Sequence, residues 1–422
     1  MTVQSRNEKI FHLTLFALSC LNVNLITIYL IIIFFLCFKG SDGFLKMCIL
    51  YTFRQVFYIP GLATITSSQI NLKLVLYTIA ALIEIFRDGD KKSSEHLTII
   101  LFGFGAGFSS LMFGSFPIAG TIKVVSFTIV FYAICLAINS CKDYFDTLKY
   151  LYSVFCVAMT VSFCLILYRR AYLWGSAGWL FRGIWNHPND FGVACSIFLA
   201  LILVYSEEIR FKELLYILCT MIMIYLSKSR GAMIASFIIL LSFAIVTNSN
   251  RDKRKMWTIA IVFLISVAIM PSLRQVFVNY FGKSGQLFGG EGLGAFQSRE
   301  DILNTAMNRF LSSPLFGRGL LISYIPGVRD YRLLESGTEP GTIFLEVLGG
   351  TGIIGVILFS VLILAFFHKA KGVYRVLTIA AVFASISEVS FFSVNNYAVI
   401  YYVLIGCSVL SKETENIYSI SE

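Results

Sequence analysis

Predominantly apolar runs recur along almost the whole chain, each long enough, or nearly long enough, to cross a bilayer. A run of about 20 apolar residues predicts a transmembrane helix. An open sheet cannot satisfy its backbone in lipid, and the alternation of a transmembrane barrel is not visible. We therefore predict an all-α polytopic membrane protein with about 12–14 transmembrane helices. The expected spans are residues 11–38, 44–60, 66–86, 97–114, 121–140, 149–168, 188–206, 212–227, 231–247, 256–270, 342–367, 376–393 and 396–410.

The first run, residues 11–38, lacks a small-residue cleavage site and is longer than the core of a signal peptide. It is therefore expected to remain in the membrane, either as one tilted helix or as a tight pair. The second run, residues 44–60, is either a full span or partly re-entrant.

Composition supports this class. Of the 422 residues, 57% are hydrophobic and 14% are charged, against about 25% charged in an average soluble domain. All ten cysteines fall in or beside apolar segments, so neither a disulfide framework nor a zinc site is indicated. No Walker loop, G-x-S-x-G elbow or dinucleotide fingerprint occurs. We expect no cofactor, no metal ion and no nucleic-acid partner.

Basic residues in short loops predict the orientation, because such loops stay in the cytoplasm. The segments RDGDKK (87–92), NRDKRK (250–255) and HKAKGVYR (368–375) agree if both termini are cytoplasmic. Residues 271–341 then form one large periplasmic loop. The expected division is N-terminal helices at 1–168, a catalytic half at 169–410 that includes this loop, and a cytoplasmic tail at 411–422.

One short loop, residues 169–187, carries positive charge on the face expected to be periplasmic. It contains Arg169, Arg170, Arg182 and His187 and no acid. An anionic partner is one explanation, and Arg182 is its best candidate. Interfacial anchoring is the other, because Trp174, Trp179 and Trp185 also fit an aromatic belt.

Two further features place arginine at the periplasmic surface. LSKSRGA (226–232) is a short turn that sets Lys228 and Arg230 where membrane meets water, with snorkelling as the alternative explanation. The large loop carries six arginines and one lysine, and the planar guanidinium suits bidentate phosphate binding. Within this loop Arg318 is a candidate cation, whereas Arg309 is expected to tolerate lysine.

The side chains expected on the periplasmic side indicate which kind of reaction they could support. The only histidine expected on the periplasmic side is His187, and no cluster with metal-ligand spacing occurs there. Several arginines with a carboxylate or an imidazole can hold a pyrophosphate leaving group while a proton is taken from an attacking hydroxyl. Exposed aromatic rings of the loops would stack on sugar.

Four motifs in the C-terminal half also carry a resemblance. FRGIWNHPNDFG (181–192), LSKSRGA, SREDILNTAMNRFLSSPLFGRGL (298–320) and TIFLEVLGGTGIIG (342–355) occur in this order. The order resembles that of the O-antigen ligase and Wzy-type polymerase family. The resemblance implies a GT-C-type membrane glycosyltransferase that uses glycan on undecaprenyl pyrophosphate at the periplasmic face, without a metal ion. It also implies that Arg230 and Arg299 take part in pyrophosphate binding or catalysis.

The last motif departs from the family pattern. Ligases carry a histidine shortly before F-L-E as the presumed base, whereas here the stretch reads TEPGTIFLE (338–346). Glu339, or less favourably Glu335, can supply a carboxylate instead. The alternative is that Glu339 is a solvated acid at a helix start, which Pro340 also suits. Glu346, inside the expected helix, either pairs with a polar neighbour or is functional.

The sequence as a whole predicts a polymerase of lipid-linked repeat units in the bacterial inner membrane. Arg230 and Arg299 would neutralise pyrophosphate, and Glu339 or His187 would act as base. The expected substrate-binding residues are Arg182, Arg318, Trp185 and Asn189. A ligase that transfers glycan to lipid A core is the first alternative, and a flippase or transporter is the second, although no internal repeat is visible. The expected partners are an undecaprenyl-pyrophosphate-linked oligosaccharide and the lipid bilayer, with a chain-length regulator and a flippase as further candidates.

Overall fold

The protein is an all-α polytopic membrane protein, as predicted. The computed structural model describes residues 3–91, 93–114, 116–141, 144–175, 178–206, 211–246, 303–304, 306–320, 342–385, 391–394 and 397–409. Within these ranges six helices are long and apolar enough to span a membrane, and shorter apolar helices accompany them. The long helices are α4 (Ser67–Asp88), α5 (Ser94–Phe113), α6 (Pro117–Ser140), α7 (Tyr144–Cys164), α8 (Pro188–Tyr205) and α14 (Ile343–Lys369).

The shorter helices resolve two of the sequence predictions. The first apolar run is a tight pair, because the chain turns at residues 20–22 and Asn22 caps the second helix through its side chain. The span expected at 376–393 is shorter than predicted, since its helix ends at Ala384. The span expected at 256–270 lies outside the described residues. The helices are α1 (Val3–Ser19), α2 (Val23–Phe34), α3 (Ser41–Val56), α9 (Phe211–Ser227), α10 (Arg230–Val246), α15 (Arg375–Ala384) and α16 (Ala398–Val409).

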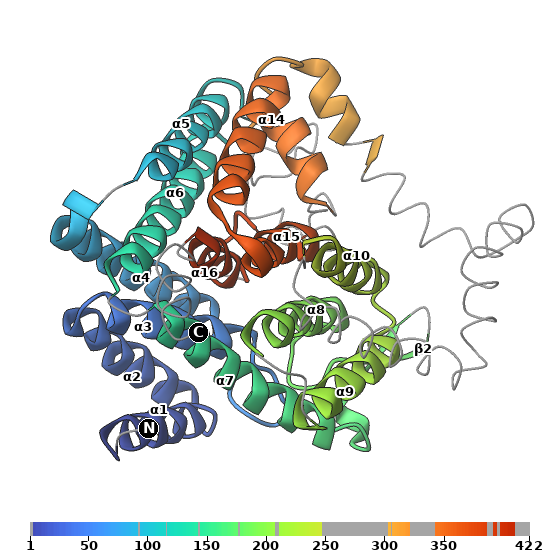
Figure 1. Cartoon of the computed structure of the whole chain (residues 1–422). Coiled ribbons are helices and arrows are strands. Elements are labelled where there is room, and N and C mark those ends of the chain that lie inside the picture. The colour runs from blue at the N-terminus through green and yellow to red at the C-terminus, as the bar shows by residue number, and fades with distance from the viewer. Residues whose placement is uncertain are drawn as a thin grey trace, which may run out of the picture.

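The helices surround two buried elements (Figure 1). Helix α8 is the most enclosed of the long helices, because 83% of its residues are buried. It contacts α7, α9, α10 and α15. Helix α16 is buried over most of its length among α3, α6, α14 and α15. Ring stacking adds to this core, for example between Phe131 and Tyr402, whose centroids lie 4.4 Å apart.

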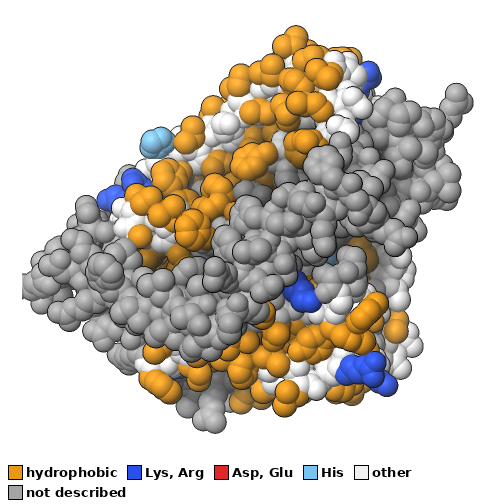
Figure 2. Space-filling model, turned by 90° about the vertical axis from the view of Figure 1, so that its right-hand side faces the viewer, with side chains coloured by type: hydrophobic (Ala, Val, Ile, Leu, Met, Phe, Trp, Pro, Cys, Tyr) orange, Lys and Arg blue, Asp and Glu red, His pale blue; other side chains and the backbone are white. Residues whose placement is uncertain are grey.

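The outward surface of the helices is largely apolar, as contact with lipid requires. Phe104 and Ile118 are each 75% exposed, and many other large apolar side chains point outward. Figure 2 shows one side of the molecule, on which hydrophobic side chains cover most of the described surface and basic groups stand apart. A protein in water seldom exposes apolar patches of this extent, so this surface fits contact with acyl chains.

Hydrogen bonds identify which helix ends lie together. The end of α1 meets the segment before α4, where Ala63 N donates to Cys20 O. The segment after α3 meets the segment before α8, where Tyr58 N donates to Ile184 O at 2.7 Å. We call this side the hairpin face, after strands β1 (Tyr172–Gly175) and β2 (Gly178–Phe181) between α7 and α8. On the opposite face, ion pairs join other helix ends, such as Lys369 of α14 with Glu95 of α5.

The hairpin was not predicted from the sequence. Strands β1 and β2 pair antiparallel, and Trp174 faces Trp179 across the ladder. The two indole rings lie 5.1 Å apart at 72°. Period-two placement of Tyr172, Trp174, Trp179 and Phe181 is the signal that was available. It was hidden because the segment is short and its tryptophans also suit a membrane interface.

Candidate functional site

Arg182 is a tightly held cation of the hairpin face. Its guanidinium carbon lies 4.5 Å from the centre of the Tyr58 ring, a cation–π geometry. Nη1 donates to Asn186 O at 3.2 Å and Nη2 to Arg170 O at 3.4 Å, whereas the buried Nε has no partner among the described residues. With only 7% of the residue exposed, this arginine is a fixed positive charge rather than a snorkelling anchor.

A hollow of about 450 Å³ opens beside Arg182. Arg169 stacks over Trp179 with 5.1 Å between the guanidinium carbon and the ring centre. No carboxylate pairs with Arg169, Arg170 or Arg182 within the described part of the chain. Three uncompensated positive charges around one hollow favour an anionic ligand. We call it the arginine pocket, lined by Pro60, Arg169, Arg170, Tyr172, Trp179 and Arg182.

Trp185 and Trp179 differ in exposure, and the sequence did not predict which of them is accessible. Trp185, expected to bind substrate, is 1% exposed and packs on Phe191 with 5.1 Å between ring centres. Its ring is therefore not available at the surface for stacking on sugar. Trp179 is 43% exposed and lines the arginine pocket, so its ring is accessible where that of Trp185 is not.

His187 occupies the N-cap of α8. Its Nδ1 accepts a hydrogen bond from the backbone N of Asn189 at 3.2 Å, and Pro188 is the first helical residue. An Nδ1 that accepts leaves the neutral ring protonated at Nε2, which then donates. In this arrangement the exposed ring presents a donor to solvent rather than a free acceptor. Asn189, the other predicted residue here, is partly exposed in the first turn of α8.

The LSKSRGA turn lies against the start of α8. A side chain at Gly192 would meet Ser229 Cβ at 2.6 Å, so only glycine permits this approach. Ser196 of α8 donates to Ala232 O of α10 at 3.0 Å. On the hairpin side, the position of a Cβ at Gly178 is 3.9 Å from Lys228 Nζ. The structure thus brings the turn that carries Arg230 onto the same face as the hairpin and His187.

The third motif docks onto a break in α14. Gly352 has φ of 65° and ψ of −163° inside this helix, a conformation that only glycine adopts readily. The break leaves backbone groups of α14 without helical partners, and the loop segment 314–320 satisfies them. The bonds run from Arg318 N to Gly349 O, Gly319 N to Gly350 O, Ile353 N to Pro314 O and Ile354 N to Leu315 O, all between 2.9 and 3.2 Å.

Glu346 is ion-paired beside this break, which was one of its two expected roles, although its partner was not identified from the sequence. Arg309 Nη1 donates to Glu346 Oε2 at 3.1 Å, and both side chains are 1% exposed. Arg309 Nη2 also donates to Gly319 O at 2.6 Å. The expectation that Arg309 tolerates lysine is therefore revised, because an ammonium cannot make both directed bonds. Arg318 keeps its side chain partly exposed, with Nε donating to Ser312 Oγ at 2.8 Å.

Arg299, Glu335 and Glu339 lie outside the described residues, as does most of the large loop 271–341. The predictions made for them stay predictions. Within the described ranges, no group of three or more His, Cys, Asp or Glu side chains is placed to hold a metal ion.

The described parts of the four motifs thus lie at one membrane face, where FRGIWNHPNDFG packs against LSKSRGA and residues 314–320 pack against α14. Residues 215–360 match the O-antigen ligase family model. The match covers α9, α10, the loop and most of α14, so the resemblance read from the motifs is confirmed over this part of the chain. No curated protein matches the chain. The family supports a membrane glycosyltransferase-type enzyme that acts on a lipid-linked glycan.

Proposed function

We propose that the protein polymerises lipid-linked oligosaccharide repeat units on the periplasmic side of the bacterial inner membrane. The growing glycan leaves undecaprenyl pyrophosphate as its anomeric C–O bond breaks, and a hydroxyl of the next unit forms the new glycosidic bond. The observation that carries this proposal is the match of residues 215–360 to the O-antigen ligase family model, with Arg230 and Arg318 inside the match and Arg182 on the same membrane face.

The arginines would work by charge neutralisation. Arg230 and Arg299 would hold the pyrophosphate through bidentate bonds, which stabilise the negative charge that develops as the leaving group departs. Arg182 and Arg318 would serve as supporting cations. Nothing in this role needs a metal ion, because the guanidinium groups supply the positive charge.

Glu339 is our choice of general base. It would take the proton of the attacking hydroxyl, which balances the negative charge that passes to the pyrophosphate. His187 is less suited to this role, since its Nδ1 already accepts the Asn189 amide and its Nε2 carries the proton. His187 is better placed to donate a hydrogen bond to a sugar or phosphate oxygen.

The alternative is an O-antigen ligase, which the description of the matching family favours. The two activities leave different products when the gene is deleted in a lipopolysaccharide-making host. Loss of a polymerase leaves core capped with one repeat unit and no long ladder on a gel. Loss of a ligase leaves bare core while long glycan accumulates on undecaprenyl pyrophosphate.

We expect the first pattern, because the chain lacks the histidine before F-L-E. Bare core with accumulated polymer would assign the ligase reaction instead. Absence of any lipid-linked unit on the periplasmic side would indicate a flippase. Re-expression of the intact chain should restore the ladder, which excludes an effect on neighbouring genes.

A further inference from the structure

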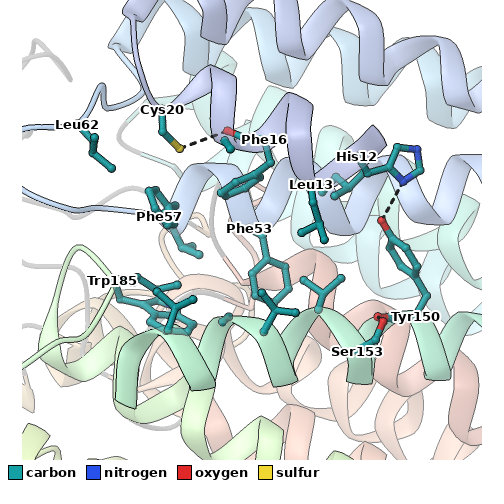
Figure 3. A pocket seen from close by; sticks show the side chains of 18 of the residues that line it. His12, Leu13, Phe16, Cys20, Phe53, Phe57, Leu62, Tyr150, Ser153 and Trp185 are labelled. Carbon is teal, nitrogen blue, oxygen red and sulfur yellow. Dashed lines mark hydrogen bonds between the residues drawn. The ribbon is translucent and has the colours of Figure 1, made fainter. Parts of the chain in front are cut away.

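An apolar cavity of about 460 Å³ lies between α1 and α3 on one side and α7 on the other (Figure 3). Its walls include Leu13, Phe16, Phe53, Val157 and Ala158. Polar groups gather at one end, where Tyr150 and His12 approach to 3.4 Å between Oη and Nδ1. At the other end the cavity reaches Trp185, close to the hairpin face.

The cavity and the arginine pocket share a wall. Phe57 and Trp185 pair as an isolated antiparallel bridge, and Tyr58 N donates to Ile184 O. Phe57, Ile184 and Trp185 line the cavity, whereas Pro60 and Arg182 of the same two segments line the arginine pocket. A long apolar space therefore ends beside three positive charges that no carboxylate of the described residues compensates.

Two buried donors mark the junction. Trp185 Nε1 and Arg182 Nε have no partner among the described residues, although the side chains are 99% and 93% buried. A buried donor without an acceptor costs free energy. Trp185 lines the cavity and Arg182 lines the arginine pocket, so the two donors belong to the wall between these spaces.

We propose that the cavity and the arginine pocket form one binding site for a polyprenyl-pyrophosphate lipid, with the isoprenoid chain in the cavity and the pyrophosphate at the arginines. The cavity follows α7 from Tyr150 to Val161, about 16 Å of helix, and takes the first part of one chain. An ordinary phospholipid fits less well, because it brings two acyl chains and a single phosphate.

This site is separate from the one assigned to the leaving pyrophosphate. Arg230 lines neither the cavity nor the arginine pocket, and the cavity lies outside residues 215–360. The polymerisation proposed above consumes two lipid-linked units, and this inference rests on that proposal. The second site holds the unit whose sugar hydroxyl accepts the chain. Arg182, which lines the arginine pocket, then serves the acceptor's pyrophosphate in place of the supporting role at the leaving pyrophosphate given above.

The test uses the full-length protein in nanodiscs of phosphatidylcholine and a photoreactive undecaprenyl pyrophosphate. Crosslinks should map to α1 and α7. Ala158→Phe, which fills the cavity, should weaken binding at least roughly tenfold, and the double change Arg169→Gln with Arg170→Gln should do the same. Inorganic pyrophosphate should compete with the lipid for binding. The double arginine variant should weaken this competition, whereas Ala158→Phe should leave the affinity for inorganic pyrophosphate unchanged.

A matched control is Ile79→Phe on α4, a side chain that is 43% exposed and lines neither space. It should leave binding unchanged. Val157→Phe provides a second filling variant if Ala158→Phe fails to give a monodisperse protein. Unchanged affinity in both filling variants would overturn the proposal, and so would equal competition by phosphatidylglycerol.

Failure of this inference differs from failure of the proposed function. Crosslinking to α1 and α7 together with bare core in the deletion strain would keep the lipid site and reject polymerisation. Capped core without such crosslinks would keep polymerisation and reject the site.

Discussion

Arg309 and Glu346 form a buried ion pair, with 3.1 Å between Nη1 and Oε2 and 1% of each side chain exposed. The pair fastens residues 306–320 to the first turn of α14. Removing one partner leaves an uncompensated buried charge, which costs about 3–5 kcal/mol. Glu346→Gln should therefore lower the melting temperature of the detergent-solubilised protein clearly, as measured by tryptophan fluorescence. Arg309→Lys should lower it as well, because lysine keeps the charge but lacks the fork that bonds both Glu346 and Gly319 O.

The exposed pair of Lys39 and Glu8 is the matched control. Its side chains are 61% and 37% exposed, and such pairs contribute about 0–1 kcal/mol. Lys39→Ala should leave the melting temperature nearly unchanged. The joint change Arg309→Met with Glu346→Leu should recover part of the lost stability, and a double variant as unstable as the single ones would argue against charge burial as the cause.

Gly352 should not tolerate alanine. Its φ of 65° strains any side chain, and a Cβ there would lie 2.5 Å from the carbonyl carbon of Leu315. Gly352→Ala should detach the loop segment 314–320 and abolish activity. Gly89→Ala is the comparison, since its φ is −58° and nothing lies within 4 Å of the added Cβ. Limited proteolysis of the large loop would report the detachment directly.

Arg230 should not be replaceable by lysine. Loss of a bidentate charge-assisted contact costs roughly tenfold to a hundredfold in turnover of lipid-linked donor, and Arg299→Lys should match it. Lys39→Arg on the opposite face should have no effect. Normal activity in both arginine variants, at normal expression, would reduce these residues to membrane anchors.

Substitutions should show that Glu339 acts as the general base and that His187 acts as the N-cap of α8. Glu339→Gln removes the proton acceptor and should lower the rate roughly a hundredfold or more. His187→Asn keeps an N-cap acceptor and should retain stability and most activity, whereas His187→Ala should lose about 1 kcal/mol of stability. A hundredfold loss in His187→Asn, with wild-type rates in Glu339→Gln, would return the base to the imidazole.

Single cysteines in a cysteine-free background test the orientation. Asn186 and Lys91 are both exposed, on the hairpin face and on the opposite face respectively. A membrane-impermeant thiol reagent applied to spheroplasts should label Asn186→Cys and should not label Lys91→Cys. The reverse pattern would put the arginine pocket in the cytoplasm.

The sequence predicted the helices well because lipid imposes a simple rule on them. Apolar length alone located α4 to α8 and α14 to within a few residues at most ends. Helix α15 ended early because apolar composition does not reveal where tertiary contacts stop a helix. The hairpin at 172–181 was missed because four-residue strands carry too few alternating positions to distinguish them from an aromatic belt.

For the candidate site, the sequence indicated which residues share a membrane face but not which of them contact one another. Arg182 and Arg230 were placed correctly on one face, since the loop charges were visible in the sequence. The pairing of Arg309 with Glu346 was not predicted, because the two residues lie 37 positions apart in the chain. The burial of Trp185 was not predicted either, because it depends on the packing of several helices. A single sequence holds no direct record of such contacts.

The break in α14 has a consequence for biogenesis. A continuous helix of 27 residues can enter the bilayer with its internal bonds complete, whereas the broken one depends on residues 314–319 for four backbone bonds. Unsatisfied backbone groups cost several kcal/mol each in lipid. The bent helix therefore becomes stable only after residues 314–319 have packed onto it, so docking of this segment precedes maturation of α14.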